Sequence, residues 1–446
     1  MAMPAPRLEK PLAAARNLQP RMAALGGALA LGLAAIFFAR AGEAAQALFT
    51  RLVTAYPLAP IVLTPAIFVG VTWLTRHRWP AARGSGIPQV MAAAEAPHHP
   101  AMAPLLSLRT ALAKVAGTLA MLLGGASVGR EGPTVQLSAA IMVAVHRWLR
   151  VPIGAGVIIA GGAAGVAAAF NTPLAGVAFA IEELASAFEQ RLALLVMLAV
   201  MTAGLVSLGL AGDYVYFGAM SQHVPIVPAL IAALGAGVAG GLAGGLFARV
   251  LSRFGTIDHG WIGALRARPV ALAAGLGLIV AVVGVATQGL GPGGPASGGL
   301  AWGTGYGTTR GLLSGADTSL WFGPAKFVTS LATALSGAPG GIFAPSLSVG
   351  AGLGQWVGLL FPPEYSGAVA MLGMIAYFAG VTRAPLTAVI IVMEMTADRA
   401  MILPLFAAAL VADQVSAQVC PEKLYHALSH AFRAPAGDAG SPQKAH

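Results

Sequence analysis

The sequence predicts an all-α integral membrane protein built from two related halves. Three features carry this prediction: an apolar composition, long segments without charge, and an internal repeat. Of the 446 residues, 57% are hydrophobic and 9% are charged, whereas about a quarter of the residues of a soluble globular protein are charged. Most of the outer surface is therefore expected to face lipid.

The charge-free segments are long enough for helices that cross a bilayer. Asp213 is the one charged residue between Arg191 and Arg249, and none lies between Arg268 and Arg310. A transmembrane helix needs about 20 apolar residues. The 58 glycines let such helices pack closely through small-residue contacts.

The elements follow in order along the chain. Residues 1–20 are expected to form a polar or amphipathic cytoplasmic lead, and the segments 22–39 and 57–75 are expected to be full spans. From residue 84 onward the apolar segments are shorter and are broken by Gly and Pro. Residues 287–316 are Gly-rich and polar, which is typical of a loop or a re-entrant segment. The expected divisions are a lead (1–20), a transmembrane domain (21–432, with halves 21–212 and 225–432) and a cytoplasmic tail (433–446).

The formal net charge of +10 does not indicate a nucleic-acid partner, because the basic residues are scattered at segment ends. By the positive-inside bias, these residues predict that both termini lie in the cytoplasm. The expected location is the cell inner membrane or the plasma membrane. A single cysteine, Cys420, excludes a disulfide framework and a thiolate metal cluster. We expect no metal and no cofactor. The basic residues near the termini are Arg7, Lys10, Arg16, Arg21, Lys423, Arg433 and Lys444.

An internal repeat appears when the sequence is displaced by 212 residues. About a quarter of positions 114–182 are then identical to their counterparts without a gap. Matches of Ala and Gly are frequent by chance in this composition, but matches of Lys, Pro and Glu are not. Two related halves, each interrupted by Gly and Pro at corresponding places, are the mark of a transporter with its site at the repeat interface. The informative pairs are Lys114 with Lys326, Pro133 with Pro345, Pro173 with Pro385, and Glu182 with Glu394.

Three short segments share one design, in which glycines precede a proline and an apolar run follows. These are Gly84 to Pro88 (GSGIP), Gly129 to Pro133 (GREGP) and Gly341 to Pro345 (GIFAP). Proline is favoured at the first helical position, so each segment predicts a helix that begins inside the membrane. A helix N-terminus offers free N–H donors and the positive end of a dipole, which together bind anions.

The energetics favour several helix termini acting together. A bare ion moved into a medium of low dielectric loses on the order of 20 kcal/mol of solvation in the Born limit. One helix terminus returns about 0.3–2 kcal/mol, and each charge-assisted hydrogen bond returns about 1.5–3 kcal/mol. Three converging termini, with the hydroxyl of Ser85, could replace the hydration shell of a small anion.

The acidic residues suggest proton chemistry. Glu131 lies at the start of a predicted intramembrane helix, where a carboxylate is costly and marks function. Charged, it can occupy the anion site as a mimic; protonated, it can swing out and carry a proton. Glu182 and Glu183 follow the apolar helix predicted over 171–181, either as solvated surface acids or as a site of proton uptake.

These residues resemble the CLC family of chloride channels and proton-coupled chloride antiporters, over about residues 20–432. The resemblance rests on the GSGIP, GREGP and GIFAP segments and on the stretch from Arg383 to Thr396. It implies an all-α, CLC-type fold of two inverted repeats with re-entrant and tilted helices. It also implies a homodimer with one pore per subunit, transporting chloride and other small anions against protons across a lipid bilayer. No cytoplasmic regulatory domain is expected.

The resemblance also assigns roles to matching residues. Glu131 would be the external gating glutamate and Glu183 the internal proton glutamate, while Gln89 and Met91 stand where bacterial antiporters often have acids. Arg130, Gly132 and Lys114 would support the site. The anion would be bound by Ser85, Gly86, Ile87, Ile342, Phe343 and Tyr425.

Two other functions compete with coupled exchange. A passive gated chloride channel is the nearest, and Glu183 argues against it because many channels have another residue there. An intramembrane serine hydrolase is a remote alternative, since Gly125 to Gly129 fits the nucleophile-elbow pattern G-x-S-x-G around Ser127. That pattern needs a strand before the serine, whereas the context here is helical. ATP-driven transport is not expected, because no P-loop lysine motif is present.

Overall fold

The computed structural model describes residues 9–184, 190–212, 215, 217–218, 224–257, 259–290 and 299–433. At 9–18, 190–192 and 211 the description covers the backbone alone. Within these ranges the regular structure is helical, apart from one isolated bridge between Gly129 and Gly341. The all-α prediction is confirmed. Residues 1–8 of the expected lead and 434–446 of the expected tail lie outside the described residues, and so do Arg7 and Lys444.

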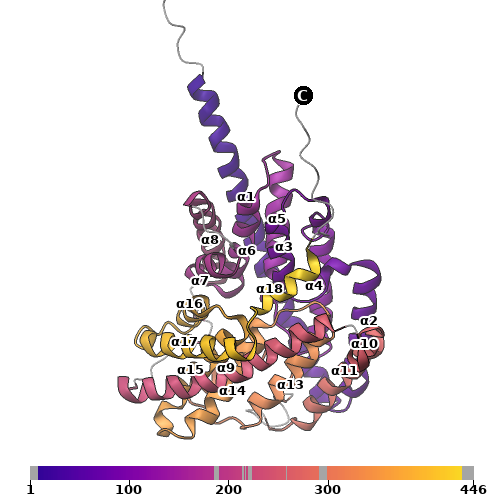
Figure 1. Cartoon of the computed structure of the whole chain (residues 1–446), viewed down its shortest axis with the longest axis vertical. Coiled ribbons are helices and arrows are strands. Elements are labelled where there is room, and N and C mark those ends of the chain that lie inside the picture. The colour runs from indigo at the N-terminus through magenta and orange to yellow at the C-terminus, as the bar shows by residue number, and fades with distance from the viewer. Residues whose placement is uncertain are drawn as a thin grey trace, which may run out of the picture.

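The first half begins with a helix much longer than predicted. Helix α1 covers Glu9–Ala55, so much of the expected lead and the span at 22–39 belong to one element. Figure 1 shows this helix projecting beyond the other elements at its N-terminal end. The other helices of this half are α2 (Pro60–Arg78), α3 (Ile87–Glu95), α4 (Leu108–Leu123), α5 (Glu131–Trp148), α6 (Ala155–Phe170), α7 (Pro173–Phe179) and α8 (Gln190–Ala211).

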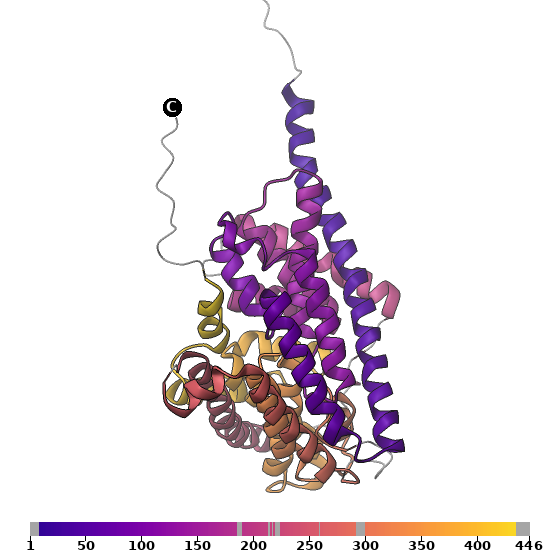
Figure 2. The same cartoon turned by 90° about the vertical axis from the view of Figure 1, so that its right-hand side faces the viewer.

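The second half lies beside the first, as the purple and the orange to yellow helices of Figures 1 and 2 show. The segment predicted as a loop or re-entrant segment over 287–316 contains a short helix, α12. The helices of this half are α9 (Ile226–Thr256), α10 (Gly260–Arg266), α11 (Pro269–Ala286), α12 (Tyr306–Leu313), α13 (Phe322–Leu335), α14 (Phe343–Gly358), α15 (Ser366–Thr382), α16 (Pro385–Thr396), α17 (Ile402–Val419) and α18 (Leu424–Ser429).

The structure keeps the register of the sequence repeat. Helices α5 and α14, and likewise α7 and α16, begin at positions 212 residues apart. The equivalent residues Gly129 and Gly341 exchange both of their backbone hydrogen bonds, at 2.8 and 2.7 Å, in an antiparallel bridge. Since a reciprocal pair between equivalent residues is what a twofold axis produces, the two halves are inverted repeats that meet at this bridge.

Two glutamates extend the twofold relation. The Glu182 carboxylate accepts hydrogen bonds from the backbone N–H groups of Leu386 and Thr387, at the start of α16. Its repeat partner Glu394 accepts from Leu174 and Ala175, at the start of α7. Each half therefore caps a helix of the other with the same side chain, which satisfies N–H groups that a helix start leaves free.

Close helix packing is visible where α9 crosses α15. A Cβ atom added to Gly244 would lie 2.7 Å from the carbonyl carbon of Gly380, and one added to Gly240 would lie 2.6 Å from that of Ala376. Only glycine permits this approach, as the small-residue content predicts.

The outer surface suits lipid. Six described helices are long and apolar enough to cross a membrane, in α1, α8, α9, α11, α15 and α17. Large apolar side chains on them are exposed, among them Phe37 on α1 and Leu205 on α8. Helix α2 does not belong to this set, so the predicted span at 57–75 stays a prediction.

Candidate anion and proton site

The GSGIP, GREGP and GIFAP segments meet where the two halves join. They lead into α3, α5 and α14, as the sequence predicts. Backbone hydrogen bonds tie the segments together: Gly84 donates to Gly337 and accepts from Gly340, beside the bridge between Gly129 and Gly341. Three helix N-termini therefore converge on one region.

The prolines lie one or two positions later than predicted. Pro88 is the second residue of α3, and Pro133 and Pro345 are the third residues of α5 and α14. Proline is tolerated at these positions for the same reason as at the first, because every N–H of the first helical turn lacks an intrahelical acceptor.

Glycines let the segments approach one another closely. A Cβ atom on Gly132 would lie 2.3 Å from the Ser85 hydroxyl oxygen, and one on Gly86, which has φ +112°, would lie 2.7 Å from the Gly132 carbonyl oxygen. A Cβ atom added to Gly341 would lie 2.9 Å from the backbone nitrogen of Gly132. The backbone itself therefore forms a narrow wall beyond Ser85.

Two buried hydroxyls face this region. Ser85 Oγ and Tyr425 Oη are both enclosed and lie near each other, but neither has a well-formed hydrogen bond. Buried hydroxyls need well-formed hydrogen bonds, so a ligand between these two groups would satisfy both. The backbone at Ile342 and Phe343 opens α14 beside them, and the Phe343 ring packs on the Tyr425 ring with centroids 5.9 Å apart.

A cavity of about 520 Å³ leads to these groups. Ser85, Ile342 and Tyr425 line it, and so does Phe432, close to the end of the described chain. Glu131 is not among the lining residues. Three of the predicted anion-binding residues thus line one cavity, whereas Gly86, Ile87, Phe343 and Glu131 do not line it.

Glu131 is almost fully enclosed, with 1% of its surface exposed. Its Oε2 folds back over Gly129, where an added Cβ would lie 2.1 Å away, and the carboxylate faces the backbone N–H of Ala344 in α14. Its Oε1 accepts a hydrogen bond of 2.8 Å from the hydroxyl of Tyr306. The carboxylate therefore occupies a helix-terminus position where an anion could bind.

Tyr306 is a residue that the sequence reasoning missed. It begins α12, in the segment predicted as a loop or re-entrant segment, and its ring packs edge-on against Phe217. The preceding residue, Gly305, has φ +84°. The sequence did contain one signal for this residue, since a tyrosine directly follows the glycines of a polar, Gly-rich segment.

Two of the predicted supporting residues, Lys114 and Arg130, donate side-chain hydrogen bonds to backbone carbonyl oxygens. Lys114 Nζ is buried and donates to the carbonyl oxygens of Arg83, at 3.0 Å, and of Gly84, at 2.7 Å, which anchors the GSGIP segment. The guanidinium of Arg130 donates to the carbonyl of Ala39 and forms an ion pair of 3.0 Å with Glu43, both on α1. Arg130 thus attaches the GREGP segment to α1.

Glu183 lies in a π-helical turn, Ala180–Leu184, that continues α7. Its residue surface is 7% exposed, and its Oε1 lies 3.8 Å from Nζ of Lys423, whose side chain is 41% exposed. Single π-helical turns occur often at functional sites. Lys423 stands two residues before Tyr425, so one short segment contacts both the acid and the cavity.

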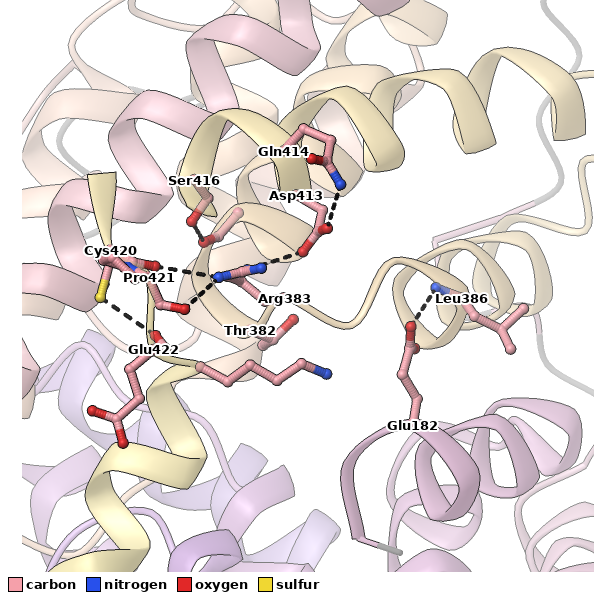
Figure 3. A network of polar contacts seen from close by, with 12 residues as sticks. Glu182, Thr382, Arg383, Leu386, Asp413, Gln414, Ser416, Cys420, Pro421 and Glu422 are labelled. Carbon is pink, nitrogen blue, oxygen red and sulfur yellow. Dashed lines mark hydrogen bonds and ion pairs between the residues drawn. The ribbon is translucent and has the colours of Figure 1, made fainter. Parts of the chain in front are cut away.

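Of the two alternatives for Glu182 and Glu183, a solvated surface acid does not fit Glu183, which is 7% exposed. Glu182 caps α16, as Figure 3 shows, and Glu183 is buried. The helix predicted over 171–181 also ends earlier, at Phe179, because the π-helical turn replaces its last residues.

The segment that carries Tyr425 is held in place by Arg383. Its guanidinium donates to the carbonyls of Cys420 and Pro421 and forms an ion pair of 3.1 Å with Asp413 on α17 (Figure 3). The conformation of Arg383 is left-handed, with φ +59°. These contacts attach the start of α18 to α15 and α17.

Ser127, the candidate nucleophile of the hydrolase alternative, contacts other hydroxyl groups. The Ser127 hydroxyl is 2.8 Å from that of Ser330, and the Ser127 N–H donates to Thr333. No strand precedes Ser127 within the described chain. No group of three or more His, Cys, Asp or Glu that could hold a metal ion occurs among the described residues.

Comparison with known families places this arrangement among chloride transport proteins. The family model described as "Voltage gated chloride channel" matches residues 67–417. An H(+)/Cl(-) exchange transporter ClcA of Yersinia pestis bv. Antiqua (strain Angola) is 32% identical over 388 residues, which cover 84% of this chain and 77% of that protein. The ClcA of Yersinia pseudotuberculosis serotype O:3 (strain YPIII) matches to the same extent.

Solved structures share the fold. A slow cyanobacterial Cl-/H+ antiporter superposes with a TM-score of 0.76 at 25% identity, over 93% of this chain and 97% of that chain. A CLC-type fluoride/proton antiporter superposes with a TM-score of 0.75 at 23% identity, over 92% of this chain and 97% of that chain. The second likeness concerns the fold alone.

Proposed function

The chain belongs to the voltage-gated chloride channel family, and from this premise we propose that it exchanges chloride for protons across a membrane. The observation that carries the proposal is the placement of two buried carboxylates, Glu131 and Glu183, around the hydroxyls of Ser85 and Tyr425. Both acids lie close enough to Tyr425 for their charges to act on it. One site can then bind either a chloride ion or a displaced carboxylate.

The anion is bound by groups that the fold already holds in place. Ser85 and Tyr425 supply O–H donors, and the first-turn N–H groups at Ile342 and Phe343 supply N–H donors. At the start of α3, Gly86 and Ile87 add the positive end of a third dipole, and Gly132 leaves room for Ser85. Such charge-assisted bonds contribute about 1.5–3 kcal/mol each, so several together offset much of the desolvation of chloride.

Glu131 acts as a gate on the side away from the cavity. In its present position the carboxylate occupies the start of α14 and accepts from Tyr306. Protonation removes its charge, so that it loses its attraction to the helix N-terminus and leaves the position free for chloride. Since the group that leaves carries a proton, opening the gate and accepting a proton are one event.

Protons and chloride use different routes on the cavity side. Chloride reaches Ser85 through the cavity, whereas Glu183 does not line that cavity. Glu183 is reached instead past the half-exposed side chain of Lys423. Lys423 supplies a positive charge beside Glu183. Gln89, one of the two positions that lack an acid here, donates to the carbonyls of Arg83 and Ala81.

The remaining assignments come from the resemblance and from the charge pattern. We propose an inner or plasma membrane location with both termini cytoplasmic, a homodimer, and no enzymatic activity. Crosslinking in membranes tests the dimer, and labelling of single cysteines introduced near Arg21 and Arg433 tests the orientation.

The decisive experiment for exchange uses sealed proteoliposomes with opposed chloride and proton gradients. Coupled exchange predicts that a chloride gradient drives protons uphill, and that a proton ionophore abolishes the proton gradient while chloride flux continues. Chloride flux without any uphill proton movement would instead establish the passive channel.

A further inference from the structure

A buried lysine of the second half holds the segment that leads to Tyr306. Lys326, on α13, has none of its surface exposed, and its Nζ donates to the three consecutive carbonyl oxygens of residues 301–303. An ammonium group has three N–H donors. All three are therefore used on the backbone of this segment, and none is left for an anion or for the carboxylate of Glu131.

Two further side chains hold the next residue, Thr304. The hydroxyl of Ser348, on α14, donates to the Thr304 carbonyl oxygen at 2.9 Å. The side-chain oxygen of Gln46, on α1, accepts hydrogen bonds from the N–H and the hydroxyl of Thr304, at 3.3 and 3.2 Å. Gly305 follows so closely that an added Cβ atom would lie 2.5 Å from the Ser348 hydroxyl oxygen. Helices α1, α13 and α14 together therefore fix the backbone directly before Tyr306.

The position of this backbone determines where the hydroxyl of Tyr306 lies. Tyr306 opens α12, and its hydroxyl donates to Glu131 Oε1 at 2.8 Å. A bond between two oxygens extends to about 3.0 Å, so a displacement of the segment by about 1 Å would break it. Arg130, next to Glu131 in the chain, and Tyr425 of α18 also act on this carboxylate. The contribution of Tyr306 is the one that depends on the segment before it.

The first half contains the same arrangement. Lys114, the repeat equivalent of Lys326, is also fully buried, and it donates to the carbonyl oxygens of the two residues before Ser85. In each half, a buried lysine therefore binds the backbone that leads to a hydroxyl of the site. That hydroxyl belongs to Ser85 in the first half and to Tyr306 in the second.

We propose that Lys326 and Ser348 are positioning residues of the gate. By holding the backbone before Tyr306, they keep its hydroxyl on Glu131 and thereby set the pH at which the chloride route opens. Neither residue is required to touch chloride or the proton that is transported. This inference rests on the proposed function, because it takes Glu131 as the gate.

The test measures chloride efflux from proteoliposomes over a series of external pH values, for the wild type, Lys326→Met and Tyr306→Phe. Without the hydrogen bond the charged carboxylate is held less firmly, so the gate opens at a higher pH. Both variants are expected to move the midpoint of the pH profile upward by about one to two pH units. The double variant should move it no further than Tyr306→Phe alone, because both changes remove one and the same hydrogen bond.

Phe327→Ala is the matched control for a general loss of stability. Phe327 is the next residue of α13, and its ring packs against the rings of Phe247 and Tyr377. The substitution leaves a cavity in the core but keeps the contacts of Lys326, so Phe327→Ala should retain the wild-type midpoint.

The proposal is overturned if folded Lys326→Met keeps the wild-type midpoint, if its shift adds to that of Tyr306→Phe, or if Phe327→Ala shifts the midpoint equally. Should Lys326→Met not fold, Ser348→Ala takes its place and is judged by the same criteria, since it removes a single hydrogen bond to the segment. Uphill proton transport by the wild type tests the proposed function separately, because the pH profile of chloride flux can be measured whether or not protons are transported.

Discussion

Helix α5 begins with Glu131, and its counterpart α14 in the second half begins with Phe343. The two helices start at equivalent positions, on either side of the bridge between Gly129 and Gly341. One start carries a carboxyl group, which we propose leaves and returns; the other carries a ring packed against Phe378 and Tyr425. The backbone is shared by both halves, whereas the ionisable side chain belongs to one.

The same contrast separates the other acids. Glu182 and Glu394 occupy equivalent positions and do the same work, since each caps a helix of the opposite half. The next residues differ: Glu183 in the first half corresponds to Met395 in the second. The acid that occurs in both halves at this position therefore caps helices, whereas Glu183, which occurs in one half, is a candidate for proton transfer.

The largest effect is expected for Glu131→Gln. The amide keeps the shape but carries no charge, so it neither competes with chloride for the start of α14 nor accepts a proton. Proton transport should be lost completely, and chloride flux should become independent of external pH. Flux assays at pH 4.5 and pH 7.5 check both points, and a variant that still moves protons would remove Glu131 from the mechanism.

The buried lysines offer a comparison of stability. Lys326 donates to three carbonyls, those of Ala301, Trp302 and Gly303, whereas Lys114 donates to two. Each buried acceptor left without a partner costs about 1–3 kcal/mol. Lys326→Met is therefore expected to lower the thermal unfolding temperature in detergent more than Lys114→Met does. Equal, small effects would show that water replaces the ammonium groups at both sites.

A smaller effect is expected for Tyr306→Phe. The ring can keep its packing against Phe217, but the hydrogen bond to Glu131 is lost. A hydrogen bond to a charged group contributes about 1.5–3 kcal/mol, and the gate opens more easily without it. Chloride flux near neutral pH should rise several-fold while proton coupling persists. Unchanged flux would mean that Ala344 and the helix dipole alone hold the carboxylate.

The sequence predicts most of the scaffold, because the repeat and the three glycine-proline segments are local patterns. It also identifies Glu131, Ser85 and Tyr425 as residues that the structure brings to one region. It does not reveal Tyr306, whose contact with Glu131 joins positions 175 residues apart.

The environment of the remaining acids and arginines depends on packing between the halves. Glu182 becomes a helix cap only because α16 begins beside it, and Glu183 is buried because α7 continues as a π-helical turn. Arg83 and Arg266 are far apart in sequence, and only the fold brings both to the lining of one cavity.

The most direct test of this account compares Glu182→Gln with Glu183→Gln in the same proteoliposomes, measuring chloride and proton fluxes together. The two residues are neighbours and the substitution is identical, so the comparison isolates the asymmetry between the halves. We predict that Glu183→Gln abolishes proton transport while chloride flux continues, and that Glu182→Gln lowers stability but keeps the coupling of protons to chloride. Proton transport that survives in Glu183→Gln, or that disappears in a folded Glu182→Gln, would contradict the account.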